Sequence, residues 1–190
     1  MSGPYFQKAP WPAFVYQDQR YCFDHLEEYI FCVNDAQSIS RQIAVTFSDH
    51  CFTREWADGD DRQLIYPMSS RQSGCFCFDR YQYSLDIRRH IQWATNGNVW
   101  NSEGTNVAII PTVIHQEQKM FYRILFSLDP VTGLPMDLRM HVRSAHLCDK
   151  KAPDTFGHVR FSHLVSLRLQ KKHPKKFFEH RRKRPRLGRL

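Results

Sequence analysis

The sequence predicts a single domain of the α+β class, built on a curved antiparallel β-sheet with one or two helices. Residues 106–147 alternate apolar and polar side chains, as strands with one buried face do. The segment LDIRRHIQWA (85–94) instead spaces its apolar residues with the period of a helix. The chain has 190 residues, of which 42% are hydrophobic, so it can build one full core.

Residues 106–147 are expected to form three antiparallel strands in series, a β-meander. NVAIIPTVIH and KMFYRILFSL flank a polar turn around Gln116–Gln118, and DPVTGLP supplies Pro130 and Gly133 for a second turn. In the third strand, MDLRMHVRSAHL, alternation separates an apolar face from a basic one. The apolar face holds Leu138, Met140 and Val142, with Ser144 as a further candidate, and the basic face holds Arg139, His141 and Arg143.

Shorter elements are predicted around this meander. We expect strands over residues 14–16, 29–33 and 43–47. The helix is predicted to begin after Ser84 as its N-cap and to end at Asn96-Gly97. Its amphipathic face would hold Leu85, Arg88, Ile91 and either Trp93 or Ala94.

Residues 158–170 form the last element of the domain and fit either a strand or a helix that is opened by Ser162. The two ends of the chain are predicted to lie outside the domain. Residues 1–12, rich in proline and aromatic side chains, form an extended lead-in. The domain then spans residues 13–170, and residues 171–190 form a basic tail.

The net charge is concentrated in that tail. Residues 171–190 hold ten of the 27 Lys and Arg residues and one of the 19 acids, Glu179, which leaves 17 basic and 18 acidic residues in the other 170. The tail therefore carries +9 and the rest −1, giving the net charge of +8. Such a run stays solvated until it meets an anion, and neutralising a phosphate backbone releases counterions. A solubilising tail is the alternative, but we expect nucleic-acid binding through Lys171, Lys172, Lys175, Lys176, Arg181, Arg182, Lys183, Arg184, Arg186 and Arg189.

The composition also predicts a compartment. The N-terminal residues lack a basic segment followed by an apolar one, as a signal peptide would have. No stretch approaches the roughly 20 apolar residues that a membrane span needs. We expect a cytoplasmic protein with no membrane partner, whose six cysteines are reduced thiols.

The sequence does not predict a metal or cofactor site. It contains no glycine-rich phosphate loop and no zinc-hydrolase motif, and no strand presents the carboxylate pair of a two-metal nuclease. Residues 55–63 are typical of a solvated acidic loop. Cys75 and Cys77, taken with His50 and Cys51, are a weaker candidate for zinc, because alternation in CFCF favours two thiols on a core face.

RNA can be cleaved without a metal if side chains supply a base, an acid and cations for the charge on phosphorus. Suitable side chains gather at two strand ends, FSDHCFTR (47–54) and RSAH (143–146). The hypothesis assigns the catalytic roles as follows: His50 as general base or acid, His146 as its partner, Arg123 and Arg54 as phosphate clamps, and Ser144 or Thr53 as positioning hydroxyls.

Each assignment has a structural alternative. A histidine beside cysteine and phenylalanine, as His50 is, is most often a core residue bonded to a backbone carbonyl, and a catalytic role needs a shifted pKa. The structural alternative is favoured more strongly for His146 and Ser144. Arg123 has the alternative of neutralising Asp137 across the sheet.

Five segments together resemble an uncharacterised bacterial family that is sometimes labelled stationary-phase growth adaptation proteins: FVYQDQRYCFDHLEEYIF, FSDHCFTREW, CFCFDRYQYS, FYRILFSL and MHVRSAHL. The resemblance covers most of residues 13–150, and its label implies no biochemistry, so no site residue is carried over from it. The YRILF strand, the turn and the strand ending in VRSAH are also similar to metal-independent ribonucleases of the barnase, colicin and RelE type. That looser similarity implies RNA as the substrate, with two departures: the sequence places no glutamate as general base, and the acidic loop has no counterpart.

Three classes of function follow from these patterns. The first is an RNA-binding protein that acts as a metal-independent RNA endonuclease of toxin or phage-defence type. The second is a non-catalytic RNA- or ribosome-binding module in which Trp56, Trp93 and Trp100 stack on bases. The third is a protein-interaction partner whose tail docks on an acidic protein. RNA or another nucleic acid is the expected partner, and an inhibitor or partner protein is a further candidate.

Overall fold

The computed structural model describes residues 5–6, 11–67, 74–102, 107–109, 112–149 and 157–172. Within these ranges an eight-stranded sheet has the order β12-β7-β8-β10-β11-β4-β3, with β9 also paired to β10. Its strands are β3 (Tyr29–Asn34), β4 (Ser40–Phe47), β7 (Asn98–Asn101), β8 (Val107–Ile109), β9 (Thr112–His115), β10 (Gln118–Pro130), β11 (Leu138–Cys148) and β12 (His158–Arg160). The prediction of an α+β fold with a curved, mainly antiparallel sheet is confirmed.

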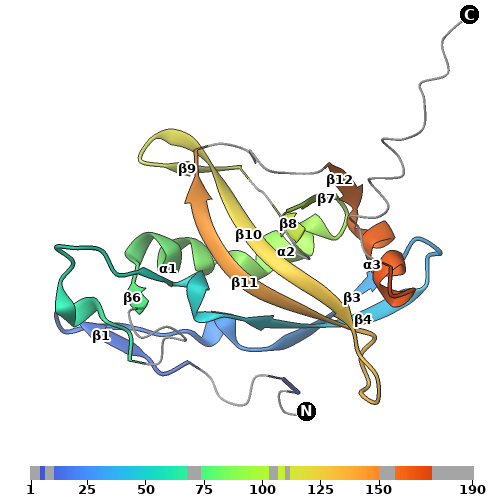
Figure 1. Ribbon diagram of the computed structural model, residues 1–190, viewed down its shortest axis with the longest axis horizontal. Coiled ribbons are helices and arrows are strands. Elements are labelled where there is room, and N and C mark those ends of the chain that lie inside the picture. The colour runs from blue at the N-terminus through green and yellow to red at the C-terminus, as the bar shows by residue number, and fades with distance from the viewer. Residues whose placement is uncertain are drawn as a thin grey trace, which may run out of the picture.

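Two small hairpins and several helices complete the described chain. The hairpins pair β1 (Phe14–Tyr16) with β2 (Gln19–Tyr21) and β5 (Thr53–Glu55) with β6 (Gly74–Phe76). The α-helices are α1 (Phe78–Ser84), α2 (Ile87–Ala94) and α3 (Phe161–Leu169), and short 3-10 turns occupy η1 (Asp24–Leu26), η2 (Asp49–Cys51) and η3 (Arg62–Leu64). Figure 1 shows β10 and β11 as long curved strands across the middle of the molecule, with α2 behind them and α1 to their left.

The predicted meander forms as β9, β10 and β11, each antiparallel to the next. Its first turn has positive φ angles at Gln116 and Glu117, the conformation of a tight two-residue hairpin. One pairing was not predicted: β11 lies parallel to β4, with Val142 opposite Phe47. This pair needs a long crossover, because parallel neighbours cannot be joined by a hairpin.

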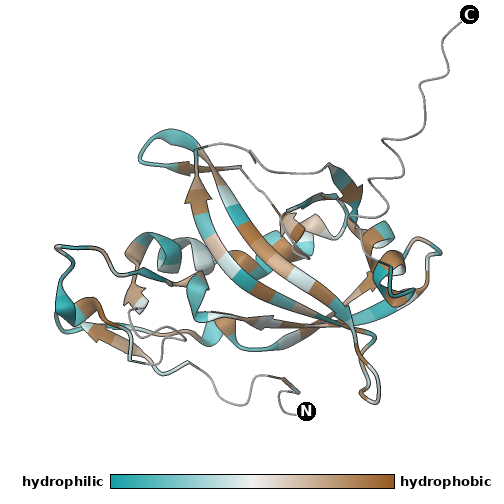
Figure 2. Cartoon of the chain, viewed as in Figure 1, coloured by the Kyte–Doolittle hydropathy of each residue, from teal (hydrophilic) through white to brown (hydrophobic). Residues whose placement is uncertain are grey.

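One face of the two long strands is buried in the core. On β10 the side chains of Tyr122, Ile124 and Phe126 are fully buried, whereas those of Arg123 and Leu125 between them are only half-buried. Figure 2 shows both hydrophobic and hydrophilic segments along β10 and β11. The same core cluster takes residues from α2 and α3. At the other end of the molecule it continues into packed aromatic rings: Phe14, Phe23, Phe52, Tyr66 and Phe76.

A β-bulge in β11 changes which side chains reach the opposite face. Leu125 pairs with Ser144, but the next residue of β10, Phe126, pairs with Val142, so Arg143 is the extra residue. Because a bulge shifts the alternation by one residue, Ala145 takes the buried position and Ser144 does not. The placement of Ser144 on the apolar face is therefore wrong.

The helical region differs from the prediction. Ser84 is the last residue of α1 rather than the N-cap of the next helix, and its hydroxyl donates to the carbonyl oxygen of Tyr81 at 2.7 Å. The following helix begins at Ile87 and buries Ile87, Ile91 and Ala94. Leu85 and Trp93 are exposed, at 45% and 73%. The apolar spacing predicted the helix but not which of its residues face the core.

The last described segment uses both predicted structures. Residues 158–160 form strand β12, and α3 starts directly after it at Phe161. The helix ends with Lys171 in the left-handed region, and the N–H of Lys172 donates to the carbonyl of Leu167, which is a Schellman-type C-cap. The first two basic residues assigned to the tail thus end this helix. The other eight lie outside the described residues.

We expect the packing of the β10–β11 pair to dominate stability. Ile124→Ala should lower the free energy of unfolding by about 2–5 kcal/mol, because Ile124 is fully buried and its truncation leaves a cavity. Urea denaturation measures this change. The control is Ile114→Ala, at a side chain that is 67% exposed, where the change should stay within about 0.5 kcal/mol. Equal effects of the two substitutions would contradict this account of the core.

Candidate functional site

The outer face of the β10–β11 pair carries arginine and histidine side chains. Across the two strands Arg123 lies opposite His146, Leu125 opposite Ser144, and Ser127 opposite His141. The bulge residue Arg143 is exposed on the same side, and Arg139 continues the row toward the β10–β11 turn. We call this surface the basic face, and its members are Arg123, Arg139, His141, Arg143, Ser144 and His146.

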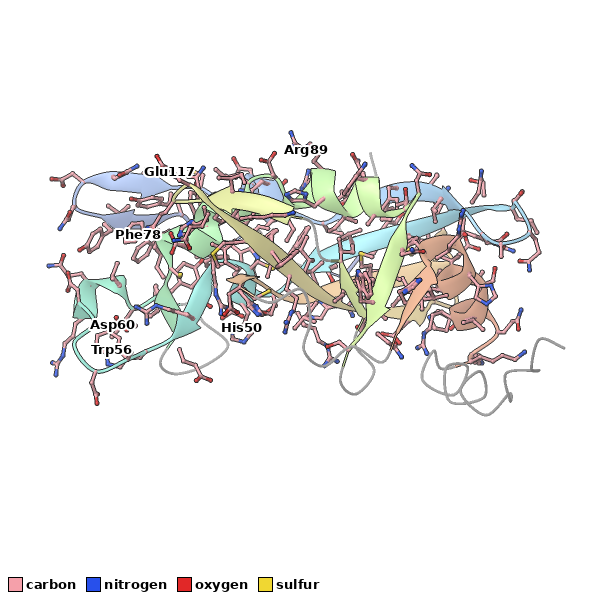
Figure 3. The ribbon with its side chains drawn as sticks, turned by 90° about the horizontal axis from the view of Figure 1, so that it is seen from above. His50, Trp56, Asp60, Phe78, Arg89 and Glu117 are labelled. Carbon is pink, nitrogen blue, oxygen red and sulfur yellow. The ribbon has the colours of Figure 1, made fainter. Side chains whose placement is uncertain are left out.

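An open cleft of about 970 Å³ adjoins the basic face. Figure 3 shows His50, Trp56 and Asp60 along one side of the molecule, with Arg89 and Glu117 on the opposite side. The cleft is lined by residues from the end of β4, β5, α1 and β11: Ser48, His50, Arg54, Glu55, Trp56, Ala57, Arg80, His141, Arg143 and Ser144. These side chains include three arginines, two histidines and one carboxylate, so the described lining favours an anionic ligand.

The short turn η2 brings His50 to the cleft. Ser48 caps this turn, since its hydroxyl oxygen accepts the N–H of His50 at 3.2 Å. The neighbours of His50 in the turn, Asp49 and Cys51, are buried. His50 itself is only half-buried and lines the cleft, so it is not a buried core residue.

Arg80 supports this turn from α1. Its Nη1 donates to the carbonyl oxygens of His50 at 3.0 Å and of Thr53 at 2.6 Å. No carboxylate in the described part of the chain lies within ion-pair distance of Arg80, although the side chain is partly buried. The guanidinium therefore brings to the cleft a positive charge that no described carboxylate neutralises.

Arg54 lines the cleft but is held by a carboxylate. Its Nη1 and Nη2 reach the two oxygens of Asp60 at 2.6 and 2.5 Å in a bidentate pair. The Arg54 guanidinium lowers the pKa of Asp60 to about 2, helped by the N–H of Ala57. Since Asp60 already neutralises Arg54, the geometry does not favour Arg54 as a phosphate clamp.

Two histidines of the basic face are held neutral by their surroundings. Burial lowers the pKa of His141, and the charges of Arg139 and Arg143 add to this effect. For His146, burial followed by the charges of Arg80 and Arg123 lowers the pKa to about 4. His141 Nδ1 lies 2.9 Å from the hydroxyl of Thr46, and this contact orients the ring.

The predicted site residues divide into three groups. His50, Arg54 and Ser144 line one cleft. His146 and Arg123 lie beside it on the basic face, where the Nδ1 of His146 is 3.3 Å from the hydroxyl of Ser144. Thr53 is fully buried and its hydroxyl donates to the carbonyl of Asp49, so a positioning role for Thr53 at the cleft is wrong.

The alternative role of Arg123 is also wrong. Asp137 accepts from Arg41 and from the N–H of Gln42, and it precedes β11 at the end far from Arg123. Arg123 faces His146 instead, and its Nε is buried with no hydrogen-bond partner among the described residues. This orphaned donor lies on the basic face.

Sequence reasoning assigned no role to several residues that line the cleft, among them Arg80, Glu55 and His141. Arg80 gave no signal, because only the tertiary structure brings α1 to the end of β11. Glu55 supplies the carboxylate that the sequence had not placed. His141 was assigned to the correct face of its strand but not to the site. The alternation Arg139, His141, Arg143 was the signal that could have found it.

The acidic loop and the thiols make no metal centre in the described chain. Asp60 pairs with Arg54, and Asp61 caps η3 and lies 3.2 Å from the hydroxyl of Tyr16. No group of three His, Cys, Asp or Glu residues among the described ranges is placed to hold a metal ion. No described helix is long and apolar enough to cross a bilayer. Of the predicted stacking aromatics, Trp56 lines the cleft, Trp93 is exposed on α2, and Trp100 packs against the ring of His158.

The fold and the site define a small α+β protein with an arginine-rich sheet face beside an open cleft. A family model described as the YjaZ family matches residues 13–169, and the chain belongs to that family. The resemblance to one uncharacterised bacterial family over most of residues 13–150 had implied that most of the chain belongs to a single family. Comparison with curated proteins and with solved structures gives no significant match.

The Arg54–Asp60 pair should make stability depend on pH in the acid range. The pKa of Asp60 in the folded protein, about 2, lies below its ordinary value of 3.8. The ion pair therefore contributes stability above pH 3.8, and this contribution is lost as the pH falls through 2. We expect Asp60→Asn to lower the free energy of unfolding at pH 6, and the difference from wild type to shrink between about pH 4 and 2.

Urea denaturation at a series of pH values measures this difference. Asp58→Asn, at an exposed turn of the same loop, is the control and should show no such pH dependence. A difference between wild type and Asp60→Asn that stays constant down to pH 2 would contradict the assignment.

Proposed function

We propose that this protein binds single-stranded RNA along the basic face and cleaves it in the adjoining cleft without a metal ion. The observation that carries the proposal is the row of arginines, which has no carboxylate partners among the described residues and leads into a cleft that holds two histidines. A toxin or phage-defence setting stays a prediction, because no feature of the described residues bears on it.

The charges on the basic face support the proposed binding of RNA. Arg80, Arg123, Arg139 and Arg143 lie on or beside one sheet face, and no described carboxylate is within ion-pair distance of any of them. The nearest acid across the strands, Asp129, is paired with Arg168 at 2.7 Å. Like charges gathered on one surface repel one another, and a chain of phosphates relieves this repulsion while releasing its own counterions.

The cleft also holds the groups that metal-free cleavage needs. His141 is neutral, and when Thr46 accepts from its Nδ1–H, Nε2 has the lone pair that takes the 2′-hydroxyl proton. The 2′-oxygen then attacks phosphorus, and the bond to the 5′-oxygen breaks as His50 protonates that oxygen. The products are a 2′,3′-cyclic phosphate and a free 5′-hydroxyl. Arg80 and Arg143 stabilise the charge on phosphorus.

A second candidate is binding without cleavage. It is favoured by the low pKa of His146, because the predicted partner of His50 is then neutral at pH 7 and a poor general acid. In this case the face grips phosphates and Trp56 stacks on a base. The two candidates share one surface and differ in whether the histidines are needed.

RNA binding should depend on the arginines of the basic face. Arg143→Ala should weaken binding of a uridine octamer and reduce the slope of log affinity against log salt by about 0.7, because one phosphate contact is lost. Fluorescence anisotropy between 50 and 200 mM salt, roughly, measures both. The matched control is Arg89→Ala, on the opposite side of the molecule, which should change neither.

The contribution of the tail is separated by a variant with glutamine at all eight basic positions from Lys175 to Arg189. It should bind more weakly with a lower salt slope, while the effect of Arg143→Ala persists in it. If Arg143→Ala has no effect in either background, the basic face does not bind RNA.

Cleavage should require both histidines of the cleft. In EDTA the wild-type protein should convert RNA to fragments ending in 2′,3′-cyclic phosphate, and His50→Ala and His141→Ala should each lower the rate by about 100-fold or more. The binding affinity for a 2′-O-methyl octamer should change little. Intact RNA with stoichiometric wild-type protein, together with normal binding, would leave the non-catalytic candidate.

A further inference from the structure

We propose that a second pocket, beside the cleft, is a nucleobase subsite that selects guanine in the bound RNA strand. The inference rests on the proposed RNA binding and adds base selectivity to it. The pocket measures about 490 Å³ and is lined by residues that include Phe6, Asp129, Thr132, Arg139, His141 and Arg143.

The position of the pocket makes it continuous with the phosphate-binding surface. His141 and Arg143 line both the pocket and the cleft. A strand whose phosphate contacts Arg143 therefore has room for a neighbouring base on the other side of the same two residues. The pocket is open, and its volume falls in the range of small-ligand sites.

A planar aromatic surface is built into this pocket. The guanidinium of Arg139 lies over the ring of Phe6, 4.8 Å from its centroid. The backbone beside Phe6 is fixed, because the carboxylate of Glu28 accepts the N–H of Tyr5 at 2.7 Å and that of Phe6 at 2.8 Å. Aromatic rings and arginine planes are the surfaces on which unpaired RNA bases stack.

A carboxylate at the edge of the pocket supplies the base selectivity. Asp129 accepts from Nη2 of Arg168 at 2.7 Å through Oδ1, while Oδ2 has no partner among the described residues and the side chain is 57% exposed. Guanine presents two adjacent donors, N1–H and the N2 amino group, to such a carboxylate. Adenine, cytosine and uracil each place an acceptor beside their donor on this edge, so only guanine matches two carboxylate oxygens.

The experiment compares 2′-O-methyl uridine octamers that carry guanine, adenine or cytosine at one central position. These strands lack the 2′-hydroxyl nucleophile, so binding is measured without cleavage. By fluorescence anisotropy the wild-type protein should bind the guanine octamer roughly fivefold or more tightly than the others, and Asp129→Asn should bind the three octamers with equal affinity.

A matched control distinguishes the loss of the Asp129 carboxylate from the loss of its ion pair with Arg168. Arg168→Gln breaks the same contact with Asp129 but keeps the carboxylate, so it should retain the guanine preference. Loss of the preference in both variants would overturn the assignment of Asp129 as the guanine acceptor.

The stacking surface is tested with Phe6→Ala. It should weaken binding of the guanine octamer roughly fivefold or more, whereas Trp93→Ala, at an exposed aromatic on α2, should not. If wild type binds all octamers equally, or if Phe6→Ala has no effect while Arg143→Ala still weakens binding, the subsite is refuted and RNA binding stands. If Arg143→Ala also has no effect, the proposed function fails with it.

Discussion

The pairing of β10 with β11, interrupted by one extra residue at Arg143, is the constraint on which both the core and the candidate site depend. On its inner side the pair presents Tyr122, Ile124 and Phe126 to the helices. Because the bulge shifts the alternation by one residue, Ala145 stays inside while Ser144 and His146 stay on the outer face. A regular strand would have exchanged these side chains and removed the hydroxyl from the cleft.

The outer face is positively charged because few carboxylates among the described residues pair with its arginines. Two acids near this surface are already paired, Asp60 with Arg54 and Asp129 with Arg168. The remaining arginines share one surface without such partners, and their charges add to the burial that lowers the pKa of His141 and of His146. A nearly neutral body can therefore present a strongly positive face, because the pairing of charges and not their number decides the local potential. The basic tail is a separate concentration of charge in the sequence.

Much of the fold was predictable from local pattern. Alternation predicted the β9–β10–β11 meander, and turn residues predicted where it reverses, since both depend on neighbours in the chain. The parallel contact of β4 with β11 was not predictable, because its two strands are about ninety residues apart and nothing in either specifies the other. Ser84 was misplaced for a similar reason: its hydroxyl caps nothing in the next helix and lies 2.7 Å from Nε2 of His25, which is distant in sequence.

Periodicity and composition were enough to predict the α+β class, the basic side of the strand at residues 138–148 and the concentration of positive charge in residues 171–190. A chain carries these properties before it folds. Which polar side chains meet depends on the folded structure. Folding places Arg80 and Glu55 in the cleft, pairs Arg54 with Asp60 and buries Thr53. Contacts between distant segments are set by the packing of the whole core.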